Sequence, residues 1–348
     1  MHGVHVSAIL VLAVGVLAAQ PQWTSQSTPT SERLRGVSAV DENVAWASGN
    51  KGTVLRTLDG GRSWQAVFGP LTEPLDFRDV EAIDENTAYV LSIGPGEQSR
   101  IYKTTDGGKN WMATFRNSEP GGFYDAIAFW DGQTGLAMGD PVGGRFTIVR
   151  TTNGGRTWTS APPEGMPPAL PDEGAFAASG TCLVVQGTRR AWFATGGAAR
   201  ARVFRSVDGG LTWQVSDTPL AAGTPSAGAF SLAFSDDGLH GIVVGGDYRR
   251  ETASSDNIAV THDGGATWSP GAIRLRGFRS AVAFVPGRQA RILLTVGPAG
   301  SDWSADGGAT WTAVGDEGFH ALSIARRGEA AWAAGEQGRI AKLASVPR

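Results

Sequence analysis

Six copies of one octapeptide dominate the sequence and constrain its fold more than any other feature. The first copy, residues 57–64, reads Thr-Leu-Asp-Gly-Gly-Arg-Ser-Trp. Every copy keeps a hydroxyl residue first, Asp or Asn third, two glycines next and Trp last. The third positions lie 43 to 55 residues apart and are Asp59, Asp106, Asn153, Asp208, Asp263 and Asp306. A repeat of this length is typical of one four-stranded blade of a β-propeller.

The chemistry of the octapeptide indicates a locked turn rather than a ligand site. Asp-Gly or Asn-Gly between β-rich runs is a strong hairpin signal, because glycine adopts positive φ at no steric cost. The carboxylate can accept bonds from backbone N–H groups and nearby hydroxyls, whereas a calcium loop needs more oxygen ligands than this spacing supplies. The tryptophans are expected to open the next strand and to pack against the blade: Trp64, Trp111, Trp158, Trp213, Trp268 and Trp311.

The two ends of the chain are expected to share one blade. Residues 329–343 repeat the pattern of residues 43–57, but no octapeptide follows them. The segment Trp23-Thr24-Ser25 matches the Trp-Thr-Ser that begins at Trp158, the last residue of the third octapeptide, so it can supply the missing outer strand next to Ile340. We therefore predict an all-β fold: a seven-bladed propeller of four-stranded antiparallel blades, closed into a ring by the N-terminal strand. Closure removes sheet edges that would invite aggregation.

An apolar residue followed by a variable one opens each repeat and marks the innermost strand. The seven apolar landmarks agree with the blade count and are Leu34, Phe77, Phe123, Phe176, Phe230, Phe278 and Phe319. The runs after them are small and apolar, which suits strands crowded around a central channel.

The net charge and the cysteine count limit the kinds of partner and of metal site that this chain can have. The net charge of −3 gives no reason to expect nucleic acid as a partner. Cys182 is the single cysteine, so no intrachain disulfide and no cysteine zinc site can form. Its apolar surroundings favour a buried core thiol over a reactive one. We expect no metal and no cofactor, and we expect a monomer.

The first nineteen residues have the pattern of a secretory signal peptide. Ala8–Ala19 is an unbroken apolar run, too short to span a bilayer comfortably, with small residues before Gln20. An uncleaved anchor and a misassigned start are the alternatives. We predict a signal peptide over residues 1–19, a propeller over residues 20–348, no transmembrane segment in the mature chain, and a periplasmic or extracellular location.

The octapeptide resembles the Asp-box, or BNR, repeat. Gly49-x-x-Gly52 before the first copy extends the likeness to the photosystem II stability/assembly factor-like propellers and to related secreted bacterial propellers, over roughly residues 21–345. Sialidases and sortilin-type receptors share the Asp box, so it is specific for the fold rather than for one function. The assembly-factor-like resemblance implies a non-enzymatic protein that binds other proteins at membranes. Longer loops at residues 139–145 and 246–257 distinguish this chain from the photosynthetic members.

One face of the predicted propeller gathers charged and aromatic side chains around the channel mouth. Loops that enter the innermost strands and loops that join the second and third strands meet there, opposite the Asp-box turns. We predict binding residues at Arg35, Arg78, Asp79, Tyr124, Asp125, Asp140, Arg145, Asp247, Tyr248, Arg279 and His320. Neighbouring loop candidates are Arg200, Arg202, Arg249, Arg250 and Glu251. Arginine forks suit carboxylate or phosphate groups, while the alternative is a solvated rim with ion pairs such as Arg78 with Asp125.

The leading functional hypothesis is an exported, non-catalytic propeller that binds a protein or assembles an envelope complex. The alternatives are a sialidase-like glycoside hydrolase, with Arg35, Arg78 and Arg279 on the sugar carboxylate and Tyr124 or Tyr248 as the hydroxyl, and a glycan-binding module. Asp79 and Asp125 would be the carboxylates for acid and base roles. No Arg-Ile-Pro signature is present near the N-terminus and no Tyr–Glu pair stands out, so we predict no catalytic residues.

Overall fold

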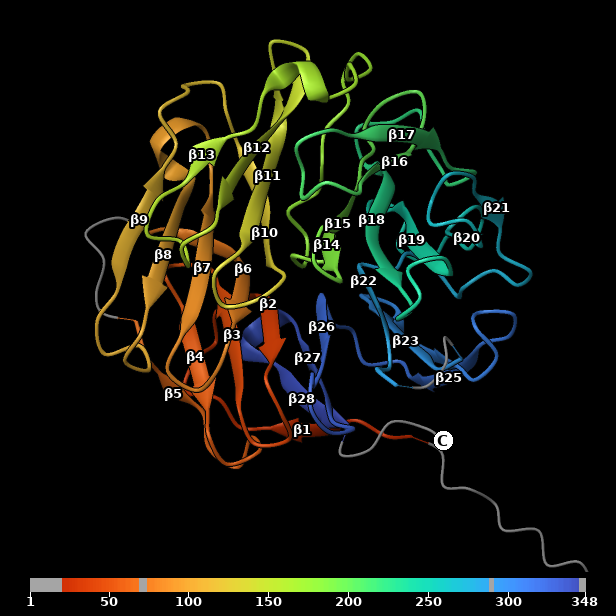
Figure 1. The fold of residues 1–348 in the computed structure, drawn as a ribbon. Coiled ribbons are helices and arrows are strands. Elements are labelled where there is room, and N and C mark those ends of the chain that lie inside the picture. The colour runs from red at the N-terminus through yellow and green to blue at the C-terminus, as the bar shows by residue number, and fades with distance from the viewer. Residues whose placement is uncertain (1–20, 69–73, 288–290, 344–348) are drawn as a thin grey trace, which may run out of the picture.

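Seven four-stranded sheets stand around a central axis in the structure, a computed structural model (Figure 1). It describes residues 21–68, 74–287 and 291–343. All strand pairings within these residues are antiparallel, and in six sheets the four strands follow one another along the chain. This confirms the predicted seven-bladed all-β propeller. The predicted signal peptide, residues 1–19, lies outside the described residues.

We number the blades I to VII in chain order. Blade I contains β2 (Leu34–Ala39), β3 (Ala45–Gly49), β4 (Val54–Thr57) and β5 (Gln65–Ala66). Blade II contains β6 (Asp76–Ala82), β7 (Ala88–Ile93), β8 (Arg100–Thr104) and β9 (Met112–Arg116). Blade III contains β10 (Tyr124–Phe129), β11 (Gly135–Val142), β12 (Arg145–Thr151) and β13 (Thr159–Ser160). Blade IV contains β14 (Leu183–Gln186), β15 (Arg190–Ala194), β16 (Arg202–Ser206) and β17 (Gln214–Asp217).

The remaining blades follow the same order from the channel outward. Blade V contains β18 (Ala227–Phe234), β19 (Gly241–Asp247), β20 (Ile258–Thr261) and β21 (Ser269–Pro270). Blade VI contains β22 (Ala281–Phe284), β23 (Leu293–Gly297), β24 (Gly300–Ser304) and β25 (Thr312–Gly315). Blade VII contains β26 (Ala321–Ile324), β27 (Ala331–Ala334), β28 (Ile340–Leu343) and β1 (Thr24–Gln26). Three short 3-10 turns complete the described structure: η1 (Gly96–Gln98), η2 (Pro163–Gly165) and η3 (Glu336–Gly338). None of its helices is long and apolar enough to cross a membrane.

The N-terminal strand closes the ring as the sequence predicted. Thr24 lies opposite Lys342 and Gln26 lies opposite Ile340, so β1 is the outer strand of blade VII (Figure 1). Trp23 packs on Phe319, with ring centroids 5.4 Å apart. The first Asp-box tryptophan adds a tie between neighbouring blades, because the indole N–H of Trp64 donates to the side-chain oxygen of Gln26 at 2.9 Å.

Each Asp box is a hydrogen-bonded turn between the third and fourth strands of its blade. In blade I, Asp59 accepts the hydroxyls of Thr57 at 2.9 Å and Ser63 at 2.6 Å, and also the backbone N–H of Ser63 at 3.0 Å. Gly60 and Gly61 both have positive φ, at 75° and 85°, which explains the paired glycines. The side-chain and backbone bonds from Ser63 lower the pKa of Asp59 to about 2.

Equivalent contacts recur in the other five boxes, so the third residue of each box holds its own turn together. In the third box Asn153 takes the place of the acid, and its amide donates to the Thr157 hydroxyl at 2.9 Å. The first glycine of each turn also donates to the hairpin that joins the first two strands of the same blade, as Gly60 does to the carbonyl of Asn43 at 2.9 Å.

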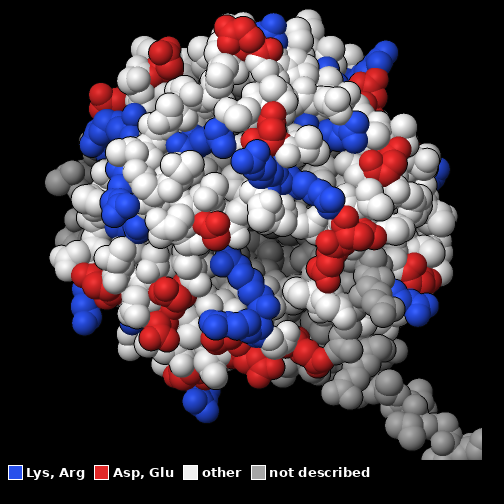
Figure 2. Space-filling view, in the orientation of Figure 1, with Lys and Arg blue, Asp and Glu red and all other residues white. Residues whose placement is uncertain are grey.

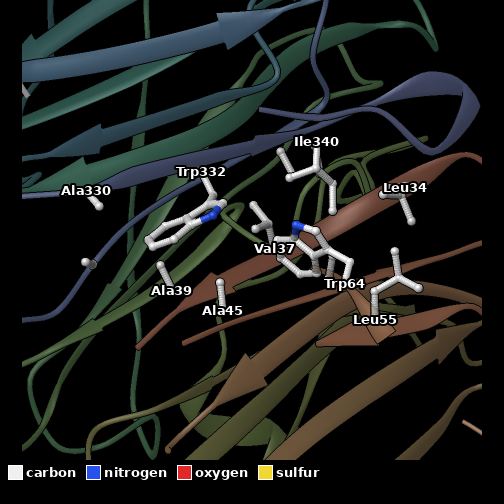
Figure 3. Packing of buried hydrophobic residues seen from close by; sticks show 13 residues of the cluster. Leu34, Val37, Ala39, Ala45, Leu55, Trp64, Ala330, Trp332 and Ile340 are labelled. Atoms are coloured by element: carbon white, nitrogen blue, oxygen red, sulfur yellow. The ribbon is translucent and has the colours of Figure 1, made fainter. Parts of the chain in front are cut away.

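The hydrophobic core lies between the blades rather than along the channel. Figure 3 shows one such layer, in which Trp64 of blade I and Trp332 of blade VII enclose Val37 and Ile340. Trp332 and Trp46 are fully buried, and the Trp46 indole donates across the blade boundary to the carbonyl of Asp84 at 3.2 Å. Alternate residues of an inner strand therefore face opposite neighbours, which fixes the register of each blade strongly. Cys182 is fully buried directly before β14, as expected for a core thiol.

Candidate functional site

A cavity of about 440 Å³ opens at the ring centre, on the side opposite the Asp-box turns. Its lining comes from the two sets of loops that the sequence indicated: loops that enter the innermost strands, and loops that join the second and third strands. The first set supplies Arg35, Arg78, Asp125 and His320, and the second supplies Asp140, Tyr248 and Glu251. The face in Figure 2 shows a hollow at the centre of the ring with Lys, Arg, Asp and Glu side chains around it.

Bulges in the innermost strands aim side chains into the cavity. In β2 the pairing with β3 shifts between Leu34 and Gly36, which leaves Arg35 without a partner position. Equivalent shifts single out Arg78 in β6, Asp125 in β10 and Phe230 in β18. A bulged residue is re-aimed relative to the regular alternation. All four bulged residues line the cavity, so the same backbone irregularity recurs around its wall.

In two more blades, the residue equivalent to Arg35 lies just before the inner strand rather than in a bulge. Ser280 and His320 each stand one residue before the first paired residue of their inner strands, Ala281 and Ala321. Both line the cavity. The lining is thus a ring of equivalent positions: Arg35, Arg78, Asp125, Phe230, Ser280 and His320.

Arginines of blades I and II form the basic side of the cavity. Burial, and then the neighbouring Arg78 and Arg33, lower the pKa of Arg35 to about 10, so its guanidinium stays charged at neutral pH. Arg78 is held in place, since its Nε donates to Asp76 at 2.8 Å and its Nη1 to the carbonyl of Ala177 at 3.0 Å. The Nε of Arg35, in contrast, is buried and makes no hydrogen bond within the described residues. The ion pair of Arg78 with Asp125, named under the alternative of a solvated rim, is absent from the described residues, where Arg78 pairs with Asp76 instead.

His320 is a neutral neighbour of this basic side. Its Nε2 lies 2.7 Å from a carboxylate oxygen of Glu336. Burial, followed by the charge of Arg35, lowers the pKa of His320 to about 4. At neutral pH the ring is therefore uncharged and donates to Glu336, so it shapes the cavity without adding charge.

Asp125 and Asp140 form the acidic side, both in blade III. Asp125 is 1% exposed, and its Oδ2 is without a hydrogen-bond partner in the described part of the chain. Burial, reinforced by Asp140, raises the pKa of Asp125 well above its ordinary value. Asp140 accepts the backbone N–H of Ala175 at 2.8 Å, and burial raises its pKa to about 6. The described residues contain no ion pair to either carboxylate.

Aromatic rings from blade V and from the segments that enter blades IV and VI line another part of the wall. Phe176 and Phe230 stack with centroids 3.8 Å apart and planes 9° apart, and Tyr248 meets both edge-on. Phe278 meets Phe230 edge-on at 4.7 Å, and all four rings line the cavity. A wall of this kind offers π faces to a bound apolar or cationic group.

A second hollow of about 680 Å³ continues from the cavity over blade IV. The two share Ala175 and Phe176, and the second is lined chiefly by Gly, Ala and Pro. Gly196 bridges both Gly174 and Gly228 here, and a Cβ on Gly196 would lie 2.6 Å from the Gly228 backbone. Because these side chains are small, they leave the groove open next to the cavity.

Five residues predicted for the binding face lie outside the cavity lining. Asp79 is buried deeper in the channel, where its Oδ2 accepts the N–H of Ile127 at 2.8 Å. Tyr124 is buried among apolar residues between blades II and III, and burial raises its pKa to about 12. Arg279 is fully buried and pairs with Asp302.

The other two lie in the loops themselves. Arg145 is at the start of β12 and donates to the carbonyl of Met166. Asp247 accepts the N–H of Arg249 at 3.0 Å and shapes the turn that carries Tyr248. Among the neighbouring loop candidates, Glu251 lines the cavity. Arg200 pairs with Asp217, and Arg202 forms a buried pair with Glu173.

A one-residue error in aligning the repeats explains two of these placements. The landmark alignment set Tyr124 and Arg279 equivalent to Arg35, but strand pairing makes Asp125 and Ser280 the equivalents. Side chains alternate along a strand, so a shift of one turns a cavity residue into a blade residue. An alignment on the apolar residue two places later (Val37, Val80, Ile127, Leu232, Val282 and Leu322) gives the correct set, and would have found Phe230 and Ser280.

The cavity does not assemble the constellation proposed for a sialidase. Arg35 and Arg78 reach it, but Arg279 points into blade VI and is neutralised by Asp302. Tyr124 does not reach it, whereas Tyr248 does. Within the described residues, no group of three His, Cys, Asp or Glu side chains is arranged to hold a metal ion.

Comparison with known protein families finds a match to part of the chain. Residues 16–166 match the family profile described as photosynthesis system II assembly factor YCF48. The chain resembles the YCF48 family. The matched stretch contains Arg35, Arg78, Asp125 and Asp140, so the YCF48-like part carries the charged sides of the cavity. No curated protein sequence matches the chain.

Solved structures give the same fold. A structure of YCF48 bound to a D1 peptide is 18% identical, with a TM-score of 0.65, over 95% of this chain and 100% of that one. YCF48 from Cyanidioschyzon merolae is 18% identical, with a TM-score of 0.60, over 92% and 98%. An ancestral GH74 enzyme is 14% identical, with a TM-score of 0.65, over 93% of this chain but 46% of its own. At these identities the likeness is one of fold.

Proposed function

We propose that this chain is an exported, non-catalytic propeller that binds a segment of a protein partner at the channel mouth. The observation that supports this most is the guanidinium of Arg35. It is partly buried at the cavity wall, close enough to Arg78 and Arg33 for their charges to lower its pKa, and its Nε lacks a hydrogen-bond partner in the described structure. Such a group is stabilised by an incoming carboxylate or phosphate.

The size of the cavity favours a polypeptide segment over a whole folded domain. Its volume of about 440 Å³ is in the range of small-ligand pockets, enough for a few side chains. The groove over blade IV continues from it, so a segment can leave the cavity along this groove. The structure of YCF48 with a D1 peptide supports a polypeptide as the ligand class for propellers of this resemblance.

Affinity capture with charge-reversed variants tests this function. We expect the purified full chain to capture a partner from an envelope extract after crosslinking. Arg35→Glu is expected to reduce the amount of captured partner at least tenfold, because it replaces attraction with repulsion at a partly buried position. Arg62→Glu is the matched control, since Arg62 is exposed on an Asp-box turn on the opposite rim. Equal capture by wild type and Arg35→Glu contradicts the proposal.

Export is a separate part of the proposal and rests on the apolar run of residues 8–19. A reporter enzyme active only outside the cytoplasm, fused after residue 30, is expected to be active. The mature N-terminus is expected close to Gln20 by mass spectrometry. Replacement of Leu12 by Arg interrupts the run and is expected to keep the fusion inside. An active fusion with that substitution argues against a signal peptide.

A glycan ligand or substrate is the second candidate, favoured by the GH74 fold match and by the carboxyl pair Asp125 and Asp140 in the cavity. A panel of fluorogenic glycosides that includes a sialoside tests it. Hydrolysis that is lost in Asp125→Asn would replace the non-catalytic proposal with a glycoside hydrolase.

A further inference from the structure

The acidic side of the cavity contains a buried carboxylate oxygen that lacks a hydrogen-bond donor in the described residues. Asp125 Oδ2 is buried, and it has no hydrogen-bond partner in the part of the chain that the structure describes. A buried carboxylate without a donor is unfavourable unless it is protonated or meets a cation. Its neighbour Asp140 also lines the cavity and has only the Ala175 N–H as a described donor.

The arginines of the cavity form no ion pair with Asp125 or Asp140 in the described residues. Arg78 uses its fork on Asp76 and on the carbonyl of Ala177. Arg35 is repelled by Arg78 and Arg33, and the largest opposing attraction comes from Glu336 rather than from blade III. The basic and acidic sides are therefore two separate parts of one cavity wall. Each can still bind a ligand group of opposite charge.

The surroundings of Asp125 favour an organic cation over a metal ion as the group that it would bind. Two carboxylates are too few for a dehydrated calcium ion, which takes six to eight oxygen ligands, and among the described residues no group of three His, Cys, Asp or Glu side chains is arranged to hold a metal ion. The rings of Phe176, Phe230 and Tyr248 stand in the same cavity. Aromatic faces next to carboxylates favour an organic cation, which gains cation–π attraction as well as charge-assisted hydrogen bonds.

We infer that Asp125 and Asp140 form a subsite for a basic group of the partner segment, a lysine or arginine side chain or a free amine. This inference rests on the proposed protein-binding function and makes it more specific. The partner segment carries a basic group for blade III and an acidic group for Arg35, within the few residues that the cavity holds. A proton shared by the two carboxylates is the competing account, in which the pair needs no ligand.

Three pools of labelled hexapeptides separate these accounts by fluorescence polarisation with the full chain. The first pool carries one Lys and one Glu at varied positions among Ala, Gly and Ser. The second replaces Lys by Gln, and the third replaces Glu by Gln. We expect the first pool to bind about tenfold tighter than the second, a typical effect of one charge-assisted contact. The Lys preference is expected to vanish in Asp125→Asn and to persist in Asp131→Asn, an exposed acid in another loop of blade III.

The outcomes distinguish this subsite from the proposed function. Equal binding of the first two pools by wild type, or a Lys preference that survives Asp125→Asn, overturns the basic subsite and leaves the Arg35 site standing. The preference for Glu over Gln is expected to survive Asp125→Asn and to vanish in Arg35→Gln. If no pool binds, both proposals fall. Asp140→Asn is the second variant, and a thermal unfolding midpoint no lower than that of wild type shows that each variant is folded.

Discussion

Asp79 gives the sharpest prediction about stability. Its carboxyl group is 5% exposed inside the channel, and its Oδ2 accepts one backbone N–H, from Ile127. Burial raises the pKa of Asp79 to about 8, well above its ordinary value of 3.8. Asp79→Asn keeps the shape and the acceptor oxygen but cannot ionise. We therefore expect the variant to be more stable than wild type at neutral and alkaline pH.

The sign and size of the effect follow from proton linkage. A group whose pKa is raised on folding stabilises the folded state below its unfolded pKa, and this stability is lost as pH rises toward the folded pKa. Between about pH 4 and pH 8 the loss is about 1.4 kcal/mol per pH unit for one such group. At pH 7 it amounts to about 4 kcal/mol, and Asp79→Asn removes it.

Urea denaturation of both proteins at each pH from 5 to 8 measures this. The difference in unfolding free energy is expected to widen steadily, because all other titrating groups are shared. Asp131→Asn controls for the loss of one negative charge in itself. A difference between Asp79→Asn and wild type that stays constant with pH, or that has the opposite sign, refutes the argument that burial holds a proton on this side chain.

Three further predictions concern the fold. Trp64→Ala is expected to lower the free energy of unfolding by about 3–5 kcal/mol, since the indole is 6% exposed between blades I and VII; a loss below 1 kcal/mol in urea would be inconsistent with its packing. Asp302→Ala leaves the fully buried Arg279 unpaired and is expected to cost about 3–5 kcal/mol, so a wild-type melting temperature would count against this pair. Ser63→Ala removes the side-chain hydrogen bond that is the largest cause of the low pKa of Asp59, so an NMR titration is expected to show a higher pKa for Asp59. An unchanged pKa would contradict this role of the Ser63 hydroxyl.

The architecture could be predicted because local chemistry repeats. The Asp-Gly-Gly turn requires the positive φ values found at Gly60 and Gly61, and each turn implies one hairpin. Counting turns and matching the two chain ends was then enough to place β1 beside β28. Nothing in this inference depends on contacts between residues of different blades.

The site was harder to predict, because the positions of its side chains depend on contacts between different blades. The face and its loops were predicted, but the spacing from the apolar landmark to the inner strand is one residue longer in the repeats of Tyr124 and Arg279, so the side chain aimed at the channel was misplaced by one residue there. The partner of Arg279 comes from β24, and the donor to Asp79 comes from blade III. Such pairings arise only when the blades are assembled.

Site-specific photo-crosslinking tests most directly whether the channel mouth is the binding surface. A photoreactive residue replaces Tyr248, which is 42% exposed at the cavity, or Leu58, which is 50% exposed on the Asp-box rim. In intact cells we expect a discrete protein adduct from position 248 that Arg35→Glu abolishes, and no such adduct from position 58. An adduct from position 58 alone, or one at position 248 that survives Arg35→Glu, would contradict the account.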